Sequence, residues 1–169
     1  MTPGYAFHAD GRYFVLAERH KSRETLGVYD VLDSYKLIRH FPLPTVSLSS
    51  LSLSPTGDHL AVWEGPFEYK LYVLNLTGST IATFSPDRDP GFGIRCIAWH
   101  PNGLFLAVGG WDDKDVAANH PLTLETFTTR DIRWAPDGKG FVLLDRDQYC
   151  CAFEVEEDDL AVSEIRALA

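Results

Sequence analysis

A short turn that closes on glycine recurs four times along the chain, and this repeat constrains the fold more than any other feature. Its glycines are Gly11, Gly57, Gly103 and Gly138, and each is followed by an apolar run. Pro, Asp and Asn favour the early positions of a tight turn, and glycine accepts the positive φ that the last position requires. Gly11 and Gly57 are 46 residues apart, and so are Gly57 and Gly103. A unit of this length with a glycine turn between its first two strands is typical of a propeller blade.

The runs around the turns have the pattern of short β-strands. Residues 94–99 and 131–134 alternate or nearly alternate between apolar and polar side chains before the third and fourth turns. Two further strand-like runs complete each of the first two units, and no segment shows sustained helical periodicity. We therefore expect an all-β chain of about four propeller blades within a single domain, residues 1–169. The expected blades are residues 1–44, 45–86, 91–128 (incomplete) and 129–169.

The spacing breaks in the third unit. Gly103 and Gly138 are only 35 residues apart, and residues 115–121 lack the alternation expected of a third strand. We interpret this as a shortening near residues 114–121, by an internal deletion, an alternative isoform or an imperfect gene sequence. The 169 residues amount to about 3.7 repeats of 46. Because an open ring leaves strand edges unpaired, we expect a partial propeller, a small four-blade ring, or a propeller completed by another copy.

Composition excludes several classes of function. Fifteen Lys and Arg against 24 Asp and Glu give a net charge of −9, which argues against nucleic-acid binding. No apolar run approaches the length of a membrane-spanning helix, and residues 1–11 lack the features of a signal peptide. The three cysteines include the adjacent pair Cys150 and Cys151, which favours reduced thiols in an intracellular protein.

Several long stretches resemble one family of WD-repeat proteins. The WD dipeptide itself is replaced by Tyr29-Asp30, Leu74-Asn75 and Phe153-Glu154. Residues 33–44, 60–66, 98–101, 106–114 and 144–155 are similar to the WD-repeat-antisense family of centrosome and spindle-pole proteins. The resemblance implies a non-enzymatic scaffold in the cytoplasm and cytoskeleton, which associates with a coiled-coil partner. Such a scaffold helps to anchor microtubule minus ends and to organise the spindle.

Candidate catalytic and metal-binding groups have simpler structural interpretations. His8 and Asp10 lie in a turn and no further ligands accompany them in sequence, so we expect turn formers rather than metal ligands. Cys150 and Cys151 lack metal-ligand spacing. No set of His, Asp or Glu recurs in phase with the repeat, as a propeller enzyme would require. We therefore predict no cofactor, metal or catalytic residue, and a fragment without independent function remains the alternative.

Tryptophan positions suggest where a partner could bind. Trp99 and Trp134 precede turns and are expected to pack between blades. Trp63 and Trp111 end second strands, so we expect them near a rim, where Trp63, Trp111, Asp112 and Asp113 form a possible partner-binding surface. The net charge of −9 predicts that microtubules are reached indirectly, because the surface of tubulin is also acidic.

Overall fold

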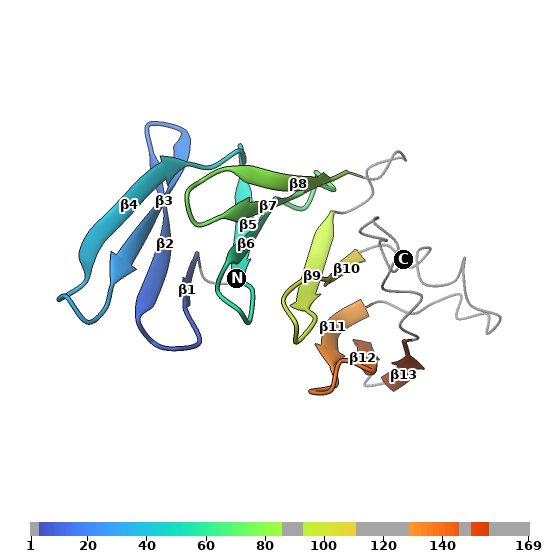
Figure 1. The fold of residues 1–169 in the computed structure, drawn as a ribbon. Helices are drawn as coiled ribbons and strands as arrows, with labels where there is room; N and C mark the ends of the chain where they lie inside the picture. Colours follow the sequence, from blue (N-terminus) through green and yellow to red (C-terminus); the bar gives the residue numbers. More distant parts are fainter. Residues whose placement is uncertain (1–3, 86–92, 111–128, 146–149, 156–169) are drawn as a thin grey trace. The chain divides into compact units, whose positions relative to one another are not determined.

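The computed structural model describes residues 4–85, 93–110, 129–145 and 150–155, and within them the regular structure consists of strands (Figure 1). The strands are β1 (Tyr5–Phe7), β2 (Tyr13–His20), β3 (Arg23–Asp30), β4 (Lys36–Pro42), β5 (Leu48–Leu53), β6 (His59–Glu64), β7 (Leu71–Asn75), β8 (Thr80–Phe84), β9 (Ile94–Trp99), β10 (Leu106–Gly110), β11 (Thr129–Trp134), β12 (Gly140–Asp145) and β13 (Cys150–Glu154). This confirms the all-β class predicted from the sequence.

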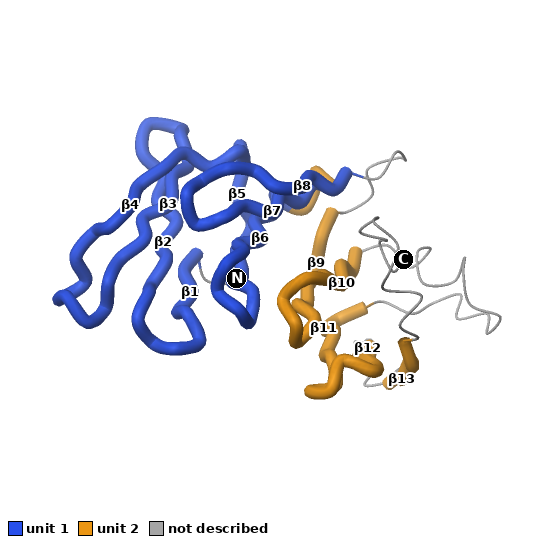
Figure 2. Tube along the Cα trace, viewed as in Figure 1, with its two compact units in different colours: residues 1–65, 70–85 blue, residues 66–69, 86–169 orange. Residues whose placement is uncertain are grey.

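Strands that are consecutive in sequence are neighbours in each sheet, and every neighbouring pair is antiparallel. The sheets are β1-β2-β3-β4, β5-β6-β7-β8, β9-β10 and β11-β12-β13. The chain divides into two compact units, coloured separately in Figure 2. Unit 1 holds residues 1–65 and 70–85, and unit 2 holds residues 66–69 and 86–169. The predicted break near residues 114–121 lies outside the described residues.

The four repeated turns share one geometry. Gly11, Gly57, Gly103 and Gly138 have φ of 73°, 76°, 74° and 72°. In every turn the glycine N–H donates to the carbonyl oxygen three residues earlier, at 2.9 Å. This geometry confirms that the sequence repeat encodes a left-handed glycine between the first two strands of each sheet.

The core of unit 1 forms where the first two sheets face each other. Val15, Leu26 and Val28 lie on one face of the β1–β4 sheet and are buried against the second sheet. Leu60 and Val62 from β6 are fully buried on the opposite side of this interface. Burying each such side chain contributes roughly 1.5–3 kcal/mol, so this interface is a large part of the stability of unit 1.

Unit 2 repeats this arrangement with different side chains. Phe141 and Leu143 from β12 are buried together with Ala107 from β10, and Cys96 and Ala98 from β9 pack against the same cluster. Leu60 and Phe141 both lie three residues after a turn glycine. In both units, therefore, the same repeat position packs against the preceding sheet.

Two buried carboxylates fix the linker between the first two sheets. The Glu24 carboxylate accepts hydrogen bonds from Thr45 Oγ1 at 2.6 Å and from Leu48 N at 2.9 Å. The Glu64 carboxylate accepts from the backbone N–H groups of Val46 and Ser47, at 3.0 and 2.9 Å. Both side chains are buried. Because buried backbone N–H groups must find acceptors, these two residues replace the sheet hydrogen bonds that the linker lacks.

Histidine and glycine meet where adjacent sheets bring their turns together. A Cβ added to Gly57 would overlap the imidazole of His8, and one added to Gly138 would overlap Nε2 of His100. His100 Nδ1 accepts the N–H of Asn102 at 3.1 Å, so Nε2 carries the proton and donates to the carbonyl oxygen of Gly138 at 3.1 Å. Each glycine thus adopts the positive φ that its own turn requires, and its missing side chain leaves room for the histidine ring from the turn of the preceding sheet.

We predict that Gly57→Ala destabilises unit 1 more than Gly11→Ala. Both glycines have positive φ, and forcing alanine into that conformation costs roughly 1–2 kcal/mol at either site. Only Gly57 faces the His8 ring, since a Cβ at Gly11 meets nothing within 4 Å. The overlap should add about 1–3 kcal/mol at Gly57, measured by urea unfolding. His8→Ala should recover part of this difference. Equal losses at the two glycines would show that the ring contact is unimportant.

We also predict that Glu24→Ala weakens folding by about 1–3 kcal/mol, because the N–H of Leu48 and the hydroxyl of Thr45 lose a buried acceptor. Glu24→Gln should lose less, since its amide keeps one acceptor oxygen. Glu18→Ala, which removes a more exposed carboxylate on β2, is the matched control. Thermal unfolding followed by circular dichroism measures all three variants. A Glu24→Ala protein as stable as Glu18→Ala would contradict the role given to Glu24.

Candidate functional site

The predicted rim is only partly visible in the structure. Trp63 lies near the end of β6 and is 4% exposed, so its side chain offers almost no surface to a partner. Trp111, Asp112 and Asp113 lie outside the described residues, and their role stays a prediction. The sequence placed Trp63 correctly near a strand end, but strand position alone does not determine whether a side chain is exposed.

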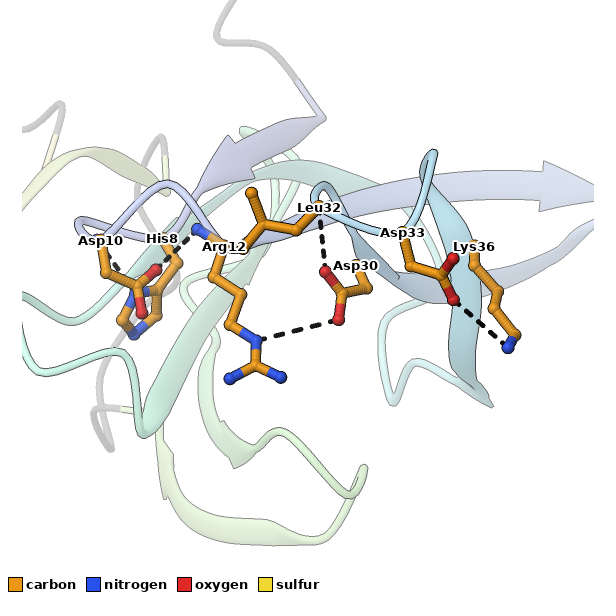
Figure 3. A network of polar contacts seen from close by, with 7 residues as sticks. All are labelled: His8, Asp10, Arg12, Asp30, Leu32, Asp33 and Lys36. Carbon is orange, nitrogen blue, oxygen red and sulfur yellow. Dashed lines mark hydrogen bonds and ion pairs between the residues drawn. The ribbon is translucent and has the colours of Figure 1, made fainter.

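A polar surface forms where the β1–β2 turn and the β3–β4 turn meet at one end of the first sheet (Figure 3). We call this surface the polar turn end, and it comprises His8, Asp10, Arg12, Asp30, Leu32, Asp33 and Lys36. Arg12 Nε lies 3.8 Å from Asp30 Oδ2, and Lys36 Nζ lies 3.3 Å from Asp33 Oδ2. The Val31 N–H donates to the carbonyl oxygen of Arg12 at 2.8 Å, which joins the two turns through the backbone.

The carboxylates of the polar turn end also order its backbone. Asp10 Oδ1 accepts the N–H of Arg12 at 2.7 Å, and Asp30 Oδ1 accepts the N–H of Leu32 at 3.0 Å. The hydrogen bond from the Arg12 backbone, with a further contribution from His8, lowers the pKa of Asp10. His8 Nδ1 lies 2.7 Å from Asp10 Oδ1 and 3.2 Å from Asp10 N. These contacts are alternatives, because Nδ1 donates to the first and accepts from the second.

The polar turn end combines charge of both signs with one exposed apolar side chain. Leu32 is 80% exposed, and Asp33 and Lys36 stand out into solvent beside it. Within the described ranges, no group of three or more His, Cys, Asp or Glu side chains is arranged to hold a metal ion. An apolar side chain surrounded by charges suits contact with another protein, in which charge sets orientation and the apolar group is buried.

A second surface is aromatic and covers one face of the first sheet. The ring of Phe14 lies 4.7 Å from that of Phe7, 6.0 Å from Tyr5, 5.9 Å from Tyr29 and 6.1 Å from Tyr35, measured between centroids. We call Tyr5, Phe7, Phe14, Tyr29 and Tyr35 the aromatic face. The aromatic face was not predicted from the sequence, although Tyr5 and Phe7 alternate around Ala6. Strand β1 has only three residues, which is too short for its period to stand out.

One tyrosine of the aromatic face is electrostatically tuned. The Tyr29 hydroxyl donates to Glu18 Oε1 at 3.3 Å. Partial burial, together with the negative charge of Glu18, raises the pKa of Tyr29. Tyr29 therefore stays neutral, and Glu18 holds its hydroxyl at the border of the aromatic face.

The cysteines differ in reactivity. Cys96 is partly buried within unit 2, and burial, with a smaller effect of the Asp131 charge, raises the pKa of its thiol to about 12. Cys150 is exposed, and both are free thiols. Since the thiolate is the reactive form, Cys96 behaves as a packing residue.

No helix in the described part of the chain is long and apolar enough to cross a membrane.

The family described as "WD domain, G-beta repeat" matches residues 78–114. A mouse protein named "WD repeat-containing protein WRAP73" is 35% identical over 117 residues, which cover 69% of this chain and 25% of that protein. An uncharacterized WD repeat-containing protein of Schizosaccharomyces pombe is 26% identical over 125 residues, covering 73% of this chain and 25% of that protein.

A more distant relative and a solved structure agree with these matches. Eukaryotic translation initiation factor 3 subunit I of Caenorhabditis elegans is 30% identical over 118 residues, covering 60% of this chain and 33% of that protein. The chain thus spans only a quarter to a third of the length of these relatives. The structure of the Dos1 propeller superposes with a TM-score of 0.59 at 15% identity, covering 88% of this chain and 38% of that one. This likeness identifies the fold as that of propeller blades.

We predict that Cys150 is alkylated at least ~10-fold faster than Cys96 in the native protein, because a thiol of pKa about 12 is almost entirely protonated at pH 8. Timed labelling with iodoacetamide, followed by peptide mass spectrometry, measures both rates. In denaturant the two cysteines should react at similar rates. Equal native rates would contradict the burial of Cys96.

Proposed function

We propose that this chain, which is a WD-repeat protein with an incomplete set of propeller blades, acts as a non-catalytic scaffold that binds protein partners. WD-repeat propellers typically serve as interaction scaffolds, and the family match and the propeller fold support this function. The observation that carries the proposal is the polar turn end, where an 80% exposed leucine stands among ordered charges. We assign it no catalytic role.

The polar turn end is suited to a partner with both apolar and charged groups. Its two turns are fixed by backbone hydrogen bonds and by the Asp10 and Asp30 carboxylates, so little conformational freedom is lost on binding. Leu32 supplies apolar area, while Arg12 and Lys36, which pair with Asp30 and Asp33 in this structure, would attract opposite charges on a partner. A coiled coil offers such a surface, since apolar seam positions are flanked by charged residues.

We further propose that the partner is a coiled-coil protein of the centrosome or spindle pole. The support is the resemblance of residues 33–44, 60–66, 98–101, 106–114 and 144–155 to the WD-repeat-antisense family, together with the mouse relative. The chain would then reside in the cytoplasm and cytoskeleton, and support microtubule minus-end anchoring and spindle organisation. With a net charge of −9, it would reach microtubules through that partner, without a role for nucleic acid or membrane.

An affinity capture with matched surface variants tests the proposal. Wild-type bait should recover a coiled-coil spindle-pole protein. The double variant Leu32→Asp/Lys36→Glu should lose it at least ~10-fold, because the apolar contact is removed and a charge is reversed. Lys21→Glu reverses an exposed charge at the other end of the same sheet, in the β2–β3 turn, and should behave like wild type.

Co-sedimentation with microtubules forms the second arm of this experiment. The purified chain alone should stay in the supernatant at moderate salt, and should pellet when the captured coiled-coil protein is added. Strong pelleting without a partner would refute the indirect mechanism. Equal capture by the double variant would refute the assignment of the surface, and capture of no coiled-coil protein by wild type would refute the proposed partner class.

A further inference from the structure

The aromatic face is more exposed than the residues at the same repeat positions in the other sheets. Counted from the turn glycines, Phe14 corresponds to Leu60 of the second sheet and to Phe141 of the fourth. Leu60 and Phe141 are both buried against the preceding sheet. Tyr5 and Phe7, at the positions of Leu51 and Leu53, are 49% and 52% exposed, whereas Leu51 is 5% exposed. The aromatic face therefore occupies the position of a sheet-sheet interface.

The two interfaces seen in the structure define what fits such a face. In each, the later sheet supplies a receiving face, which contains Leu60 or Phe141, and the earlier sheet packs its opposite face against it. In unit 2 the receiving face is also aromatic: the Phe141 ring lies 5.1 Å from Trp134 and 5.1 Å from Phe153. It packs against the small side chains of Cys96, Ala98 and Ala107. An aromatic receiving face thus pairs with a strand face of small residues.

A face with small and medium side chains is present on the β11–β13 sheet, on the side opposite Phe141. Val142 pairs with Ala152, and Leu144 pairs with Cys150, so these four residues share that side. Ala152 and Cys150 are exposed. Arg133 lies beside Val142 on the same side and is exposed. Its Nε donates to Asp131 Oδ2 at 2.8 Å, and the flat face of its guanidinium group can still stack on an aromatic ring.

Charge favours pairing between the first sheet and the fourth. The predicted first blade, residues 1–44, contains six Lys and Arg against five Asp and Glu. The predicted fourth blade, residues 129–169, contains five Lys and Arg against ten Asp and Glu. With net charges of +1 and −5, a first blade and a fourth blade attract each other, against the general repulsion between two copies that each carry −9.

We propose that the aromatic face is a self-association site, which receives the Val142–Ala152 face of the β11–β13 sheet from a second copy of this chain. The contact would repeat, between two molecules, the sheet-sheet interface that the chain forms within units 1 and 2. Each copy carries one aromatic face and one Val142–Ala152 face, so a single contact of this kind joins two copies. The aromatic face adjoins the polar turn end at Tyr35, which lies between Asp33 and Lys36, but the two surfaces share no residue, so self-association does not require the partner binding proposed above.

Sedimentation equilibrium of the full chain over a wide concentration range tests the proposal. Wild type should pass from the monomer mass of 18.9 kDa towards twice that mass. Phe7→Lys should weaken association at least ~10-fold, because a charged side chain replaces an aromatic contact. Ile81→Lys is the matched control, since Ile81 on β8 is 54% exposed but lies outside the aromatic face. Unchanged thermal unfolding would show that both variants remain folded.

A photoreactive benzoylphenylalanine at position 7 identifies the occupant. The proposal predicts a crosslinked species of twice the monomer mass, in which residues 140–144 or 150–155 of the second copy are joined to position 7. A crosslink within one chain would show that the chain covers its own aromatic face, and would overturn the proposal. A monomer at every concentration, or equal weakening by Phe7→Lys and Ile81→Lys, would also overturn it. Retained partner capture by Phe7→Lys would separate this site from the polar turn end.

Discussion

Packing of the opposite faces of successive sheets is the interaction on which the described structure depends. A single antiparallel sheet of short strands has little independent stability, because one of its faces always exposes apolar side chains to water. In unit 1, Val15 and Val28 close that face against Leu60 and Val62. In unit 2, Ala107 is covered by Phe141 and Leu143. In both units the later sheet contributes the face that contains Leu60 or Phe141, so the interface has a direction along the chain.

Polar contacts determine how closely two sheets meet and how the chain passes between them. Glu24 and Glu64 lie on different sheets of unit 1, yet both accept hydrogen bonds from the linker that joins those sheets. The ring of His8 occupies the space left by the missing side chain of Gly57. These groups bury less apolar surface than the core does, but they favour one arrangement of the two sheets. Any other arrangement would leave a buried N–H without an acceptor or would bring a side chain into a space that only glycine leaves open.

The sequence predicted the repeated elements well, because glycine turns and strand alternation are local signals. The four turn glycines and the flanking strands are found where the turn motif placed them, with φ near 74° in each turn. Features that depend on how one sheet packs against another, such as the burial of a side chain, were harder to predict. Trp63 was expected near a rim and is buried, and Glu24 and Glu64 gave no pattern that marked them as linker anchors. The aromatic face became visible only when its exposure was compared with Leu51 and Leu60.

Hydrogen exchange of individual amides, followed by NMR under native conditions, tests most directly whether sheet-sheet packing holds unit 1 together. If the two sheets depend on one another, the amides of Val15 and Val28 in the first sheet and of Leu60 and Val62 in the second open with the same free energy. They should also respond equally to denaturant. A first sheet that opens at a clearly lower free energy, while Leu60 and Val62 stay protected, would contradict the account.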